Sequence, residues 1–184
     1  MTAGKRLKTM TGKGLSVGKK LLKFILPKSA PKAIEPAQNR NRGQMHPTRG
    51  LKPSEIFDRI YLNGAWGKDN EGCSISGSGS HNNRIKAPYI KATKEILQRK
   101  NLKVIVDLGC GDFNIGKNFV EDCERYVACD ISNVILDRNK KKFDFDNVEF
   151  HKVDIARDEL PSGDIAFVRQ VLQHMSNDDI MRFV

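Results

Sequence analysis

The feature that most constrains the fold is a series of four short apolar runs at 103–108, 125–130, 148–153 and 164–168. Runs of this length and composition are typical of strands that are buried on both faces of a sheet. A helical segment over about 133–142 separates the second run from the third. Because strands that alternate with helices form βαβ units, the sequence predicts an α/β fold whose parallel sheet lies between two helical layers.

Residues 51–100 precede the first strand and contain two predicted helices. One begins near Pro53, and the other starts at Pro88 and runs to about residue 100. The stretch between them, 63–83, is rich in Gly and Ser and contains the single tryptophan, Trp66. Two interpretations stay open for this stretch: a linker, or a loop over a ligand in which Trp66 and residues 74–80 exclude water. Trp66 is equally compatible with a core or docking role.

Residues 1–50 form a third part of the chain with a charge of their own. They contain twelve Lys and Arg but one acid, which makes them +11, whereas residues 51–184 are −1. Four prolines and many small polar residues predict a disordered basic tail with a short amphipathic helix over 15–26. Four interpretations stay open for this tail: it binds an anionic membrane surface, it binds an acidic partner such as a nucleic acid, it is an organelle-targeting segment, or it only improves solubility.

The cysteines and the apolar segments exclude several classes of protein. The four cysteines form no C-x-x-C pair, and no histidine stands at zinc-ligand spacing from them, so we expect reduced thiols and no metal site. No apolar run approaches the roughly 20 residues of a membrane span, and no signal peptide is recognisable. A cytoplasmic protein is the expectation.

Suitable ligand-binding groups stand at the ends of three successive strands. The first strand leads into Asp107 and a turn with Gly109 and Gly111; the second ends at Asp130, and Asp154 follows the third. Ligands bind at the carboxyl edge of open parallel sheets, where a glycine turn approaches a ligand and a later acid binds ribose hydroxyls. Each acid has an alternative role in capping a helix or a turn.

These motifs resemble those of class I S-adenosylmethionine-dependent methyltransferases, which have a Rossmann-like three-layer fold. The four matching segments are VIVDLGCGDFNIG, YVACDIS, VEFHKVDI and GDIAFVRQVLQHM, and the resemblance covers about residues 85–184. The upstream segment FDRIYLNGAWGKDNEGCSISGSGS is similar to a subgroup of small bacterial and viral-type methyltransferases, some of which are associated with glycan-modifying genes.

The resemblance implies S-adenosylmethionine as cofactor and assigns expected contacts by position. The residues expected around the methionine part are Asp107, Gly109, Cys110, Gly111, Arg169 and Gln170. Asp130 would bind the ribose and Asp154 the adenine amine, with Ile131 and Ile155 against the ring. His174 is either a general base for the acceptor or a packing residue, and Trp66 is the other candidate near the acceptor.

Two features of the glycine turn depart from related patterns. Many members of the resembled family have a third glycine where Phe113 stands, so we expect the loop to turn differently or to use Gly116. A dinucleotide site would need a glycine at Asn114, and Asp112 would repel its phosphates, whereas a sulfonium cofactor tolerates acids.

The resemblance leaves the acceptor and the completeness of the domain open. We expect methyl transfer to a small molecule or glycan, without a metal; the alternatives are an RNA methyltransferase that uses the tail and a non-catalytic Rossmann-like binding module. The family's sheet has seven strands, and the sequence predicts only four. We therefore expect a fragment that lacks the C-terminal strands and has impaired activity.

Overall fold

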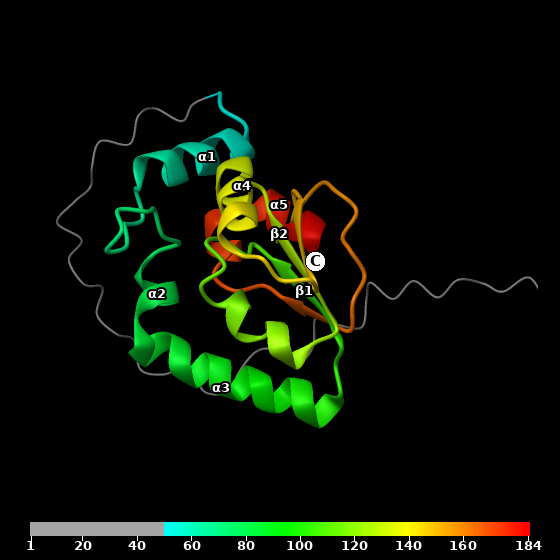
Figure 1. Ribbon diagram of the computed structural model, residues 1–184. Coiled ribbons are helices and arrows are strands. Elements are labelled where there is room, and N and C mark those ends of the chain that lie inside the picture. The colour runs from blue at the N-terminus through cyan, green and yellow to red at the C-terminus, as the bar shows by residue number, and fades with distance from the viewer. Residues whose placement is uncertain (1–49) are drawn as a thin grey trace, which may run out of the picture. The chain divides into compact units, whose positions relative to one another are not determined.

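The computed structural model describes residues 50–184, in which four parallel strands form one sheet (Figure 1). The strands are β1 (Val104–Leu108), β2 (Arg125–Asp130), β3 (Val148–Lys152) and β4 (Ile165–Phe167). Their order across the sheet is β3-β2-β1-β4, and every neighbouring pair is parallel. Each strand lies within one residue of a run predicted from the sequence, so the expected α/β fold with a parallel sheet is confirmed.

Helices cover both faces of the sheet. They are α1 (Pro53–Asn63), α2 (Ser78–His81), α3 (Asn83–Lys100), α4 (Asn133–Lys142) and α5 (Asn177–Phe183). On one face, α3 and α4 pack their buried leucines and isoleucine against β1 and β2, and on the other face Phe183 of α5 packs against the same strands. The described part of the chain therefore has the three layers of a Rossmann-like fold.

The helices before the sheet share its core. Tyr61 of α1 and Leu97 of α3 lie in the same cluster of buried side chains as Ile105 of β1. A hydrophobic contact of this kind fixes residues 53–100 against the sheet. None of the helices within residues 50–184 has the length and apolar character needed to cross a membrane.

The start of α3 differs from the prediction. The helix begins at Asn83, five residues before Pro88, and the side chain of Asn82 caps it by accepting the N–H of Arg84 at 2.9 Å. Proline lacks the N–H that an interior residue donates to the carbonyl four residues earlier, so its local preference is for the first turn of a helix. The Asn82 cap and the packing of the later turns stabilise a helix that contains this proline.

Helix α4 begins where the sequence predicts, and its first turn also anchors α1. Ser132 caps α4, and the Ser132 hydroxyl donates to Asp58 Oδ1 of α1 at 2.6 Å. The N–H of Val134 donates to the same oxygen at 3.2 Å. These bonds hold α1 beside the carboxyl end of β2, next to the site described below. The basic tail and its predicted helix over 15–26 lie outside the described residues.

Candidate functional site

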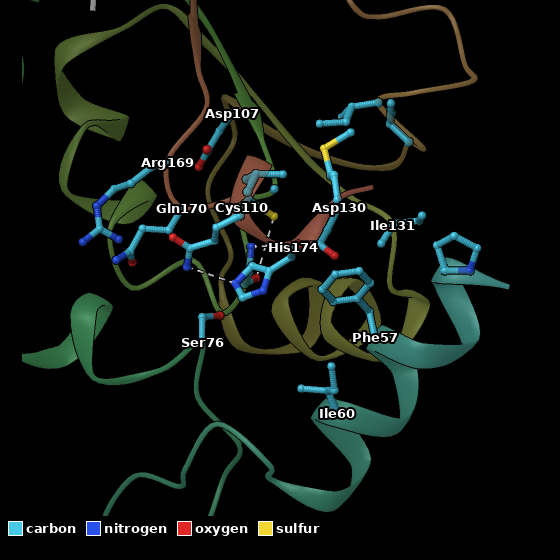
Figure 2. A pocket seen from close by; sticks show the side chains of 18 of the residues that line it. Phe57, Ile60, Ser76, Asp107, Cys110, Asp130, Ile131, Arg169, Gln170 and His174 are labelled. Carbon is cyan, nitrogen blue, oxygen red and sulfur yellow. Dashed lines mark hydrogen bonds between the residues drawn. The ribbon is translucent and has the colours of Figure 1, made fainter. Parts of the chain in front are cut away.

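The carboxyl ends of the strands open onto a cavity of about 560 Å³ (Figure 2). This volume is in the usual range of small-molecule sites, which is about 300–1,000 Å³. The twelve candidate cofactor and acceptor residues from the sequence all line it: Trp66, Asp107, Gly109, Cys110, Gly111, Asp130, Ile131, Asp154, Ile155, Arg169, Gln170 and His174. The fold therefore gathers these residues into one site, while the role of each stays a prediction.

The loop after β1 depends on its two glycines. Gly109 has φ 87° and Gly111 has φ 55°, both in the left-handed region that disfavours other residues. A Cβ on Gly109 would lie 2.4 Å from Cγ2 of Val171, and one on Gly111 would lie 2.2 Å from Oγ of Ser76. Both conformation and close packing therefore require glycine. Between them lies Cys110, and burial raises the pKa of its thiol well above the usual value, so the thiol is neutral.

Phe113 replaces the expected third glycine without changing the handedness of the backbone. It adopts φ 59° itself, and its fully buried ring makes edge contacts with Tyr126, Phe143 and Phe150. Gly116 provides the space, because a Cβ there would lie 2.4 Å from a ring carbon of Phe113. Ring packing thus compensates for a backbone conformation that costs a non-glycine residue about 1–2 kcal/mol.

Asp130 combines a capping role with a position in the cavity wall. Its carboxylate accepts the N–H of Gly111 and the N–H of Ser132, both at 3.0 Å. Burial raises the pKa of Asp130 to about 6, although these backbone hydrogen bonds oppose the rise. A carboxylate has about four acceptor positions, so both oxygens retain capacity for a ligand. The capping interpretation and the binding interpretation are therefore compatible.

Asp107 is the second buried carboxylate of the cavity. The hydroxyl of Tyr126 donates to its Oδ2 at 2.9 Å, and burial raises the pKa of Asp107 to about 7 against the effect of that hydrogen bond. Its side chain caps no helix. Figure 2 shows Asp107 and Asp130 on the two sides of the Cys110 loop, so the wall carries two acids whose ionisation a cationic ligand would favour.

Asp154 is held by an ion pair that also reaches α5. Arg157 donates to Asp154 Oδ2 and to Asp179 Oδ1, each at 2.9 Å, and the N–H of Ala156 donates to Asp154 Oδ1 at 3.1 Å. Ile131 and Ile155 line the cavity near this carboxylate. The arrangement fixes an acceptor beside two apolar side chains, which suits a flat heterocycle with an amino group.

Arg169 is a cation without an acidic partner among residues 50–184. It donates to the carbonyl of Gly79 at 2.8 Å, and its guanidinium carbon lies 5.3 Å from the centre of the Tyr89 ring. No carboxylate of the described chain lies within ion-pair distance of it. The next residue, Gln170, has φ 56° and packs against Gly79. Guanidinium N–H groups therefore remain for a bound anion.

Trp66 and His174 belong to one aromatic cluster. Their ring centres are 5.0 Å apart with planes tilted by 32°, and Phe57 contacts both rings edge-on. Burial lowers the pKa of His174, which favours the neutral imidazole. Tyr61 also packs against Trp66. The cluster gives one side of the cavity an aromatic wall that contains a neutral base.

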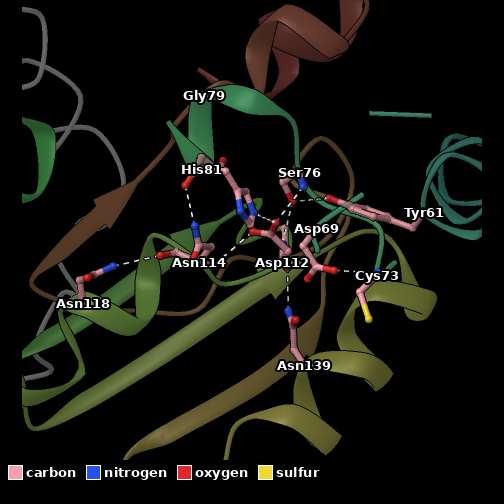
Figure 3. A network of polar contacts seen from close by, with 12 residues as sticks. Tyr61, Asp69, Cys73, Ser76, Gly79, His81, Asp112, Asn114, Asn118 and Asn139 are labelled. Carbon is pink, nitrogen blue, oxygen red and sulfur yellow. Dashed lines mark hydrogen bonds and ion pairs between the residues drawn. The ribbon is translucent and has the colours of Figure 1, made fainter. Parts of the chain in front are cut away.

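A network around Asp112 was not predicted from the sequence (Figure 3). Asp112 accepts from the N–H of Ser76 at 2.9 Å and lies 2.6 Å from Nε2 of His81. Tyr61 Oη and Ser76 Oγ are 3.1 Å apart. The sequence marked Asp112 as an acid that would repel the phosphates of a dinucleotide, and no spacing rule connects it with His81. The Gly/Ser stretch is thus folded against the cavity, which favours a covering loop over a linker.

One group of potential metal ligands occurs among residues 50–184. Side-chain atoms of Asp69, Glu71 and Cys73 lie near one another on a turn away from the cavity. The Asp69 carboxylate already accepts the N–H groups of Glu71 and Cys73 at 3.0 and 2.8 Å. These bonds account for the turn without an ion.

Comparison with known proteins finds a family match for the C-terminal part of the chain. A family model described as a methyltransferase domain matches residues 105–184. Magnesium protoporphyrin IX methyltransferase from Synechocystis, solved with bound SAH, aligns over 71% of this chain and 62% of its own, with 15% identity and a TM-score of 0.53. This similarity supports the Rossmann-like fold.

Other solved structures align over shorter parts. The methyltransferase domain of a bacterial CtHen1 aligns over 52% of this chain and 55% of its own, with 20% identity and a TM-score of 0.47. A methyltransferase from Clostridium acetobutylicum aligns over 53% and 43%, with 20% identity and a TM-score of 0.45. The chain thus spans about half the length of these structures. No curated protein sequence matches it.

Proposed function

We propose that residues 105–184 form a class I S-adenosylmethionine-dependent methyltransferase domain, which binds the cofactor in the cavity at the strand ends and transfers its methyl group to a small acceptor. The observation that carries the proposal is the convergence of Asp107, Asp130 and Asp154 on one cavity. Three acids at successive strand ends suit a ligand with one ammonium group, one sulfonium, a ribose and an amino-heterocycle.

We assign the two ends of the cofactor to opposite sides of the cavity. Asp130 would accept the ribose hydroxyls and Asp154 the adenine amine, a proposal supported by their remaining acceptor positions and by Ile131 and Ile155 beside them. Asp107 would attract the ammonium group of the methionine part. Arg169 would receive its carboxylate, since this guanidinium has no acidic partner among residues 50–184.

The protein's contribution to the reaction is mainly alignment and exclusion of water. The sulfonium group of the cofactor supplies an already activated methyl group. The glycine loop, the aromatic cluster and the 76–81 segment would hold the acceptor in line with that group, and such positioning contributes a large part of the rate of transfer reactions. His174 would take the proton from a hydroxyl acceptor, which its lowered pKa supports.

The charge of the cavity favours a small molecule or a glycan over RNA as the acceptor. Among its described lining residues are five aspartates and only two arginines, and Arg157 is already paired with two of the acids. Phosphate-rich ligands need the opposite balance. The aromatic wall of Phe57, Trp66 and His174 offers apolar ring faces instead. RNA methylation through residues 1–50 remains the alternative, because that part carries +11.

Calorimetric titration of the full chain with S-adenosylmethionine tests the cofactor assignment. Asp130→Asn is expected to weaken binding about tenfold or more, because a hydrogen bond to a charged group contributes about 1.5–3 kcal/mol. Asp144→Asn, at an exposed aspartate outside the cavity, is the matched control and should bind like the wild type. A wild-type chain that shows no heat of binding contradicts the proposal and favours a non-catalytic module.

An RNA mobility-shift titration over increasing salt separates the two acceptor classes. If residues 1–50 contact phosphates, the logarithm of affinity falls linearly with the logarithm of salt concentration. A small-molecule enzyme is expected to show weak RNA binding that does not compete with the cofactor. Tight RNA binding that strengthens in the presence of S-adenosylmethionine would support the RNA alternative instead.

A further inference from the structure

We propose that His81 and Asp112 form a latch that holds residues 76–81 closed over the cavity. The contacts that form the latch are made by residues of this chain alone. The effect of the latch on cofactor exchange rests on the proposed function. His81 does not line the cavity and touches Asp112, which does. His81 is therefore a positioning residue, and its effect on a ligand passes through the loop after β1.

Both ends of the segment are attached to the same residue of that loop (Figure 3). At the first end, the N–H of Ser76 donates to Asp112 Oδ2 at 2.9 Å, and Ser76 Oγ accepts the N–H of Asp112 at 2.7 Å. At the other end, His81 Nε2 lies 2.6 Å from Asp112 Oδ2. A single buried carboxylate thus closes the segment into a loop.

Two further contacts connect the middle of the segment with both neighbouring loops. Asn114 Nδ2 donates to the carbonyl of Ser80 at 2.7 Å, and Arg169 Nη2 donates to the carbonyl of Gly79 at 2.8 Å. Asn114 follows β1 and Arg169 follows β4, so the segment bridges the loops after two adjacent strands. Ser76 and Ser80 line the cavity from this bridge.

The composition of the segment makes these polar contacts decisive. Its sequence, SGSGSH, has no large apolar side chain that would pack it against the core. Gly77 has φ 87° and no atom near its Cβ position, so the backbone there is free to change conformation. Regions that are held by a few polar bonds open at low free-energy cost. The bond between His81 and a buried acid is the strongest class of contact available to it.

Partial tryptic digestion of the full chain without cofactor tests the latch. The peptide bonds after Lys68 and Arg84 flank the segment. His81→Phe is expected to speed cleavage at these bonds about tenfold, as expected for the loss of a charge-assisted hydrogen bond, while cleavage elsewhere in residues 50–184 keeps its rate. His81→Gln, which retains a side-chain N–H donor, should restore most of the protection.

The chain offers a matched control in a second histidine–carboxylate pair. His151 Nε2 lies 2.9 Å from Glu149 Oε2 on β3, and neither residue lines the cavity. His151→Phe is expected to leave cleavage after Lys68 and Arg84 unchanged. Equal cleavage in the wild type and His81→Phe would overturn the latch, and so would equal acceleration by the control. If His81→Phe does not fold, Asn114→Ala must speed the same cleavages.

Stopped-flow fluorescence of the single Trp66 then measures cofactor release. His81→Phe is expected to raise the dissociation rate of S-adenosylmethionine about tenfold, and His81→Gln to leave it near the wild-type rate. Unchanged dissociation together with faster proteolysis would overturn the control of cofactor exchange. A wild type that does not bind the cofactor refutes the proposed function, and the digestion result alone then decides the latch.

Discussion

Gly116 and Phe113 should be energetically coupled, since the glycine provides the space that the ring occupies. A Cβ on Gly116 would lie 2.4 and 2.6 Å from two ring carbons of Phe113 and 2.7 Å from Tyr126 Oη. Because φ at Gly116 is outside the left-handed region, Gly116→Ala causes crowding and no backbone strain. Overpacking of this kind lowers the free energy of unfolding by about 1–3 kcal/mol.

Phe113→Ala should cost more, because the ring is fully buried. Removal of a buried phenylalanine ring lowers stability by about 3–5 kcal/mol, and the left-handed backbone remains in place. In the double mutant, two of the three close contacts of the new methyl group are absent. The total loss should therefore be smaller than the sum of the single losses by about 1 kcal/mol or more, within the usual coupling of about 0.5–3 kcal/mol for residues in contact.

Urea unfolding of the four proteins measures this coupling, provided that their m values agree. Gly72→Ala is a suitable control, because its Cβ would meet no atom within 4 Å and only φ 79° makes it unfavourable. The stability lost in Gly72→Ala should therefore add to the stability lost in Phe113→Ala. The reasoning is refuted if the effects of Gly116→Ala and Phe113→Ala add within about 0.5 kcal/mol, the limit for independent sites.

Three further predictions concern two acidic residues and one helix cap. The pKa of Asp107 is about 7 in the folded protein and 3.8 as the ordinary value, so the folded state binds more protons between these limits and its stability should fall as pH rises from about 4 to about 7. Asp107→Asn should flatten that profile in urea unfolding, and an unchanged slope would exclude Asp107 as its source. Glu149→Gln should cost less than about 1 kcal/mol despite the lowered pKa of Glu149, because its pair with Arg125 is solvent-exposed; a larger loss would contradict the screening argument. Ser132→Ala should cost about 1–2 kcal/mol as a lost helix cap. It should also couple with Asp58→Ala in a double-mutant cycle, whereas full additivity would mean that the bond to α1 contributes nothing.

The strands and the acids at their ends were predictable because their signals are local. Residues 104–108 are apolar enough to be buried on both faces, and the parallel arrangement then brings the end of every strand to one edge. Asp107, Asp130 and Asp154 follow from that topology alone. Their hydrogen-bond partners could not be predicted, because no sequence pattern links Tyr126, Ser132 or Arg157 to these acids.

The start of α3 was predicted wrongly and the course of the glycine turn was left open for the same reason. In both places tertiary contacts outweigh the conformational preference of a single residue. Pro88 favours the first turn of a helix, but the Asn82 cap and the packing of Leu97 place it in the interior. A phenylalanine disfavours the left-handed backbone found at Phe113, but the space beside Gly116 lets its ring be buried. The stability gained by burying the ring exceeds the cost of the backbone conformation. In both cases a tertiary contact overrides a local preference of the backbone.

The sequence by itself determined the class of the fold, the sheet edge at which the cavity lies and the carboxylates that line it, because strand period and connection handedness leave few alternatives. Only the tertiary structure decided that Ser76 and His81 meet Asp112 and that Trp66 lies on His174. Those pairs are far apart along the chain, and their geometry depends on how α1 and the Gly/Ser segment pack over the sheet, for which no local pattern exists.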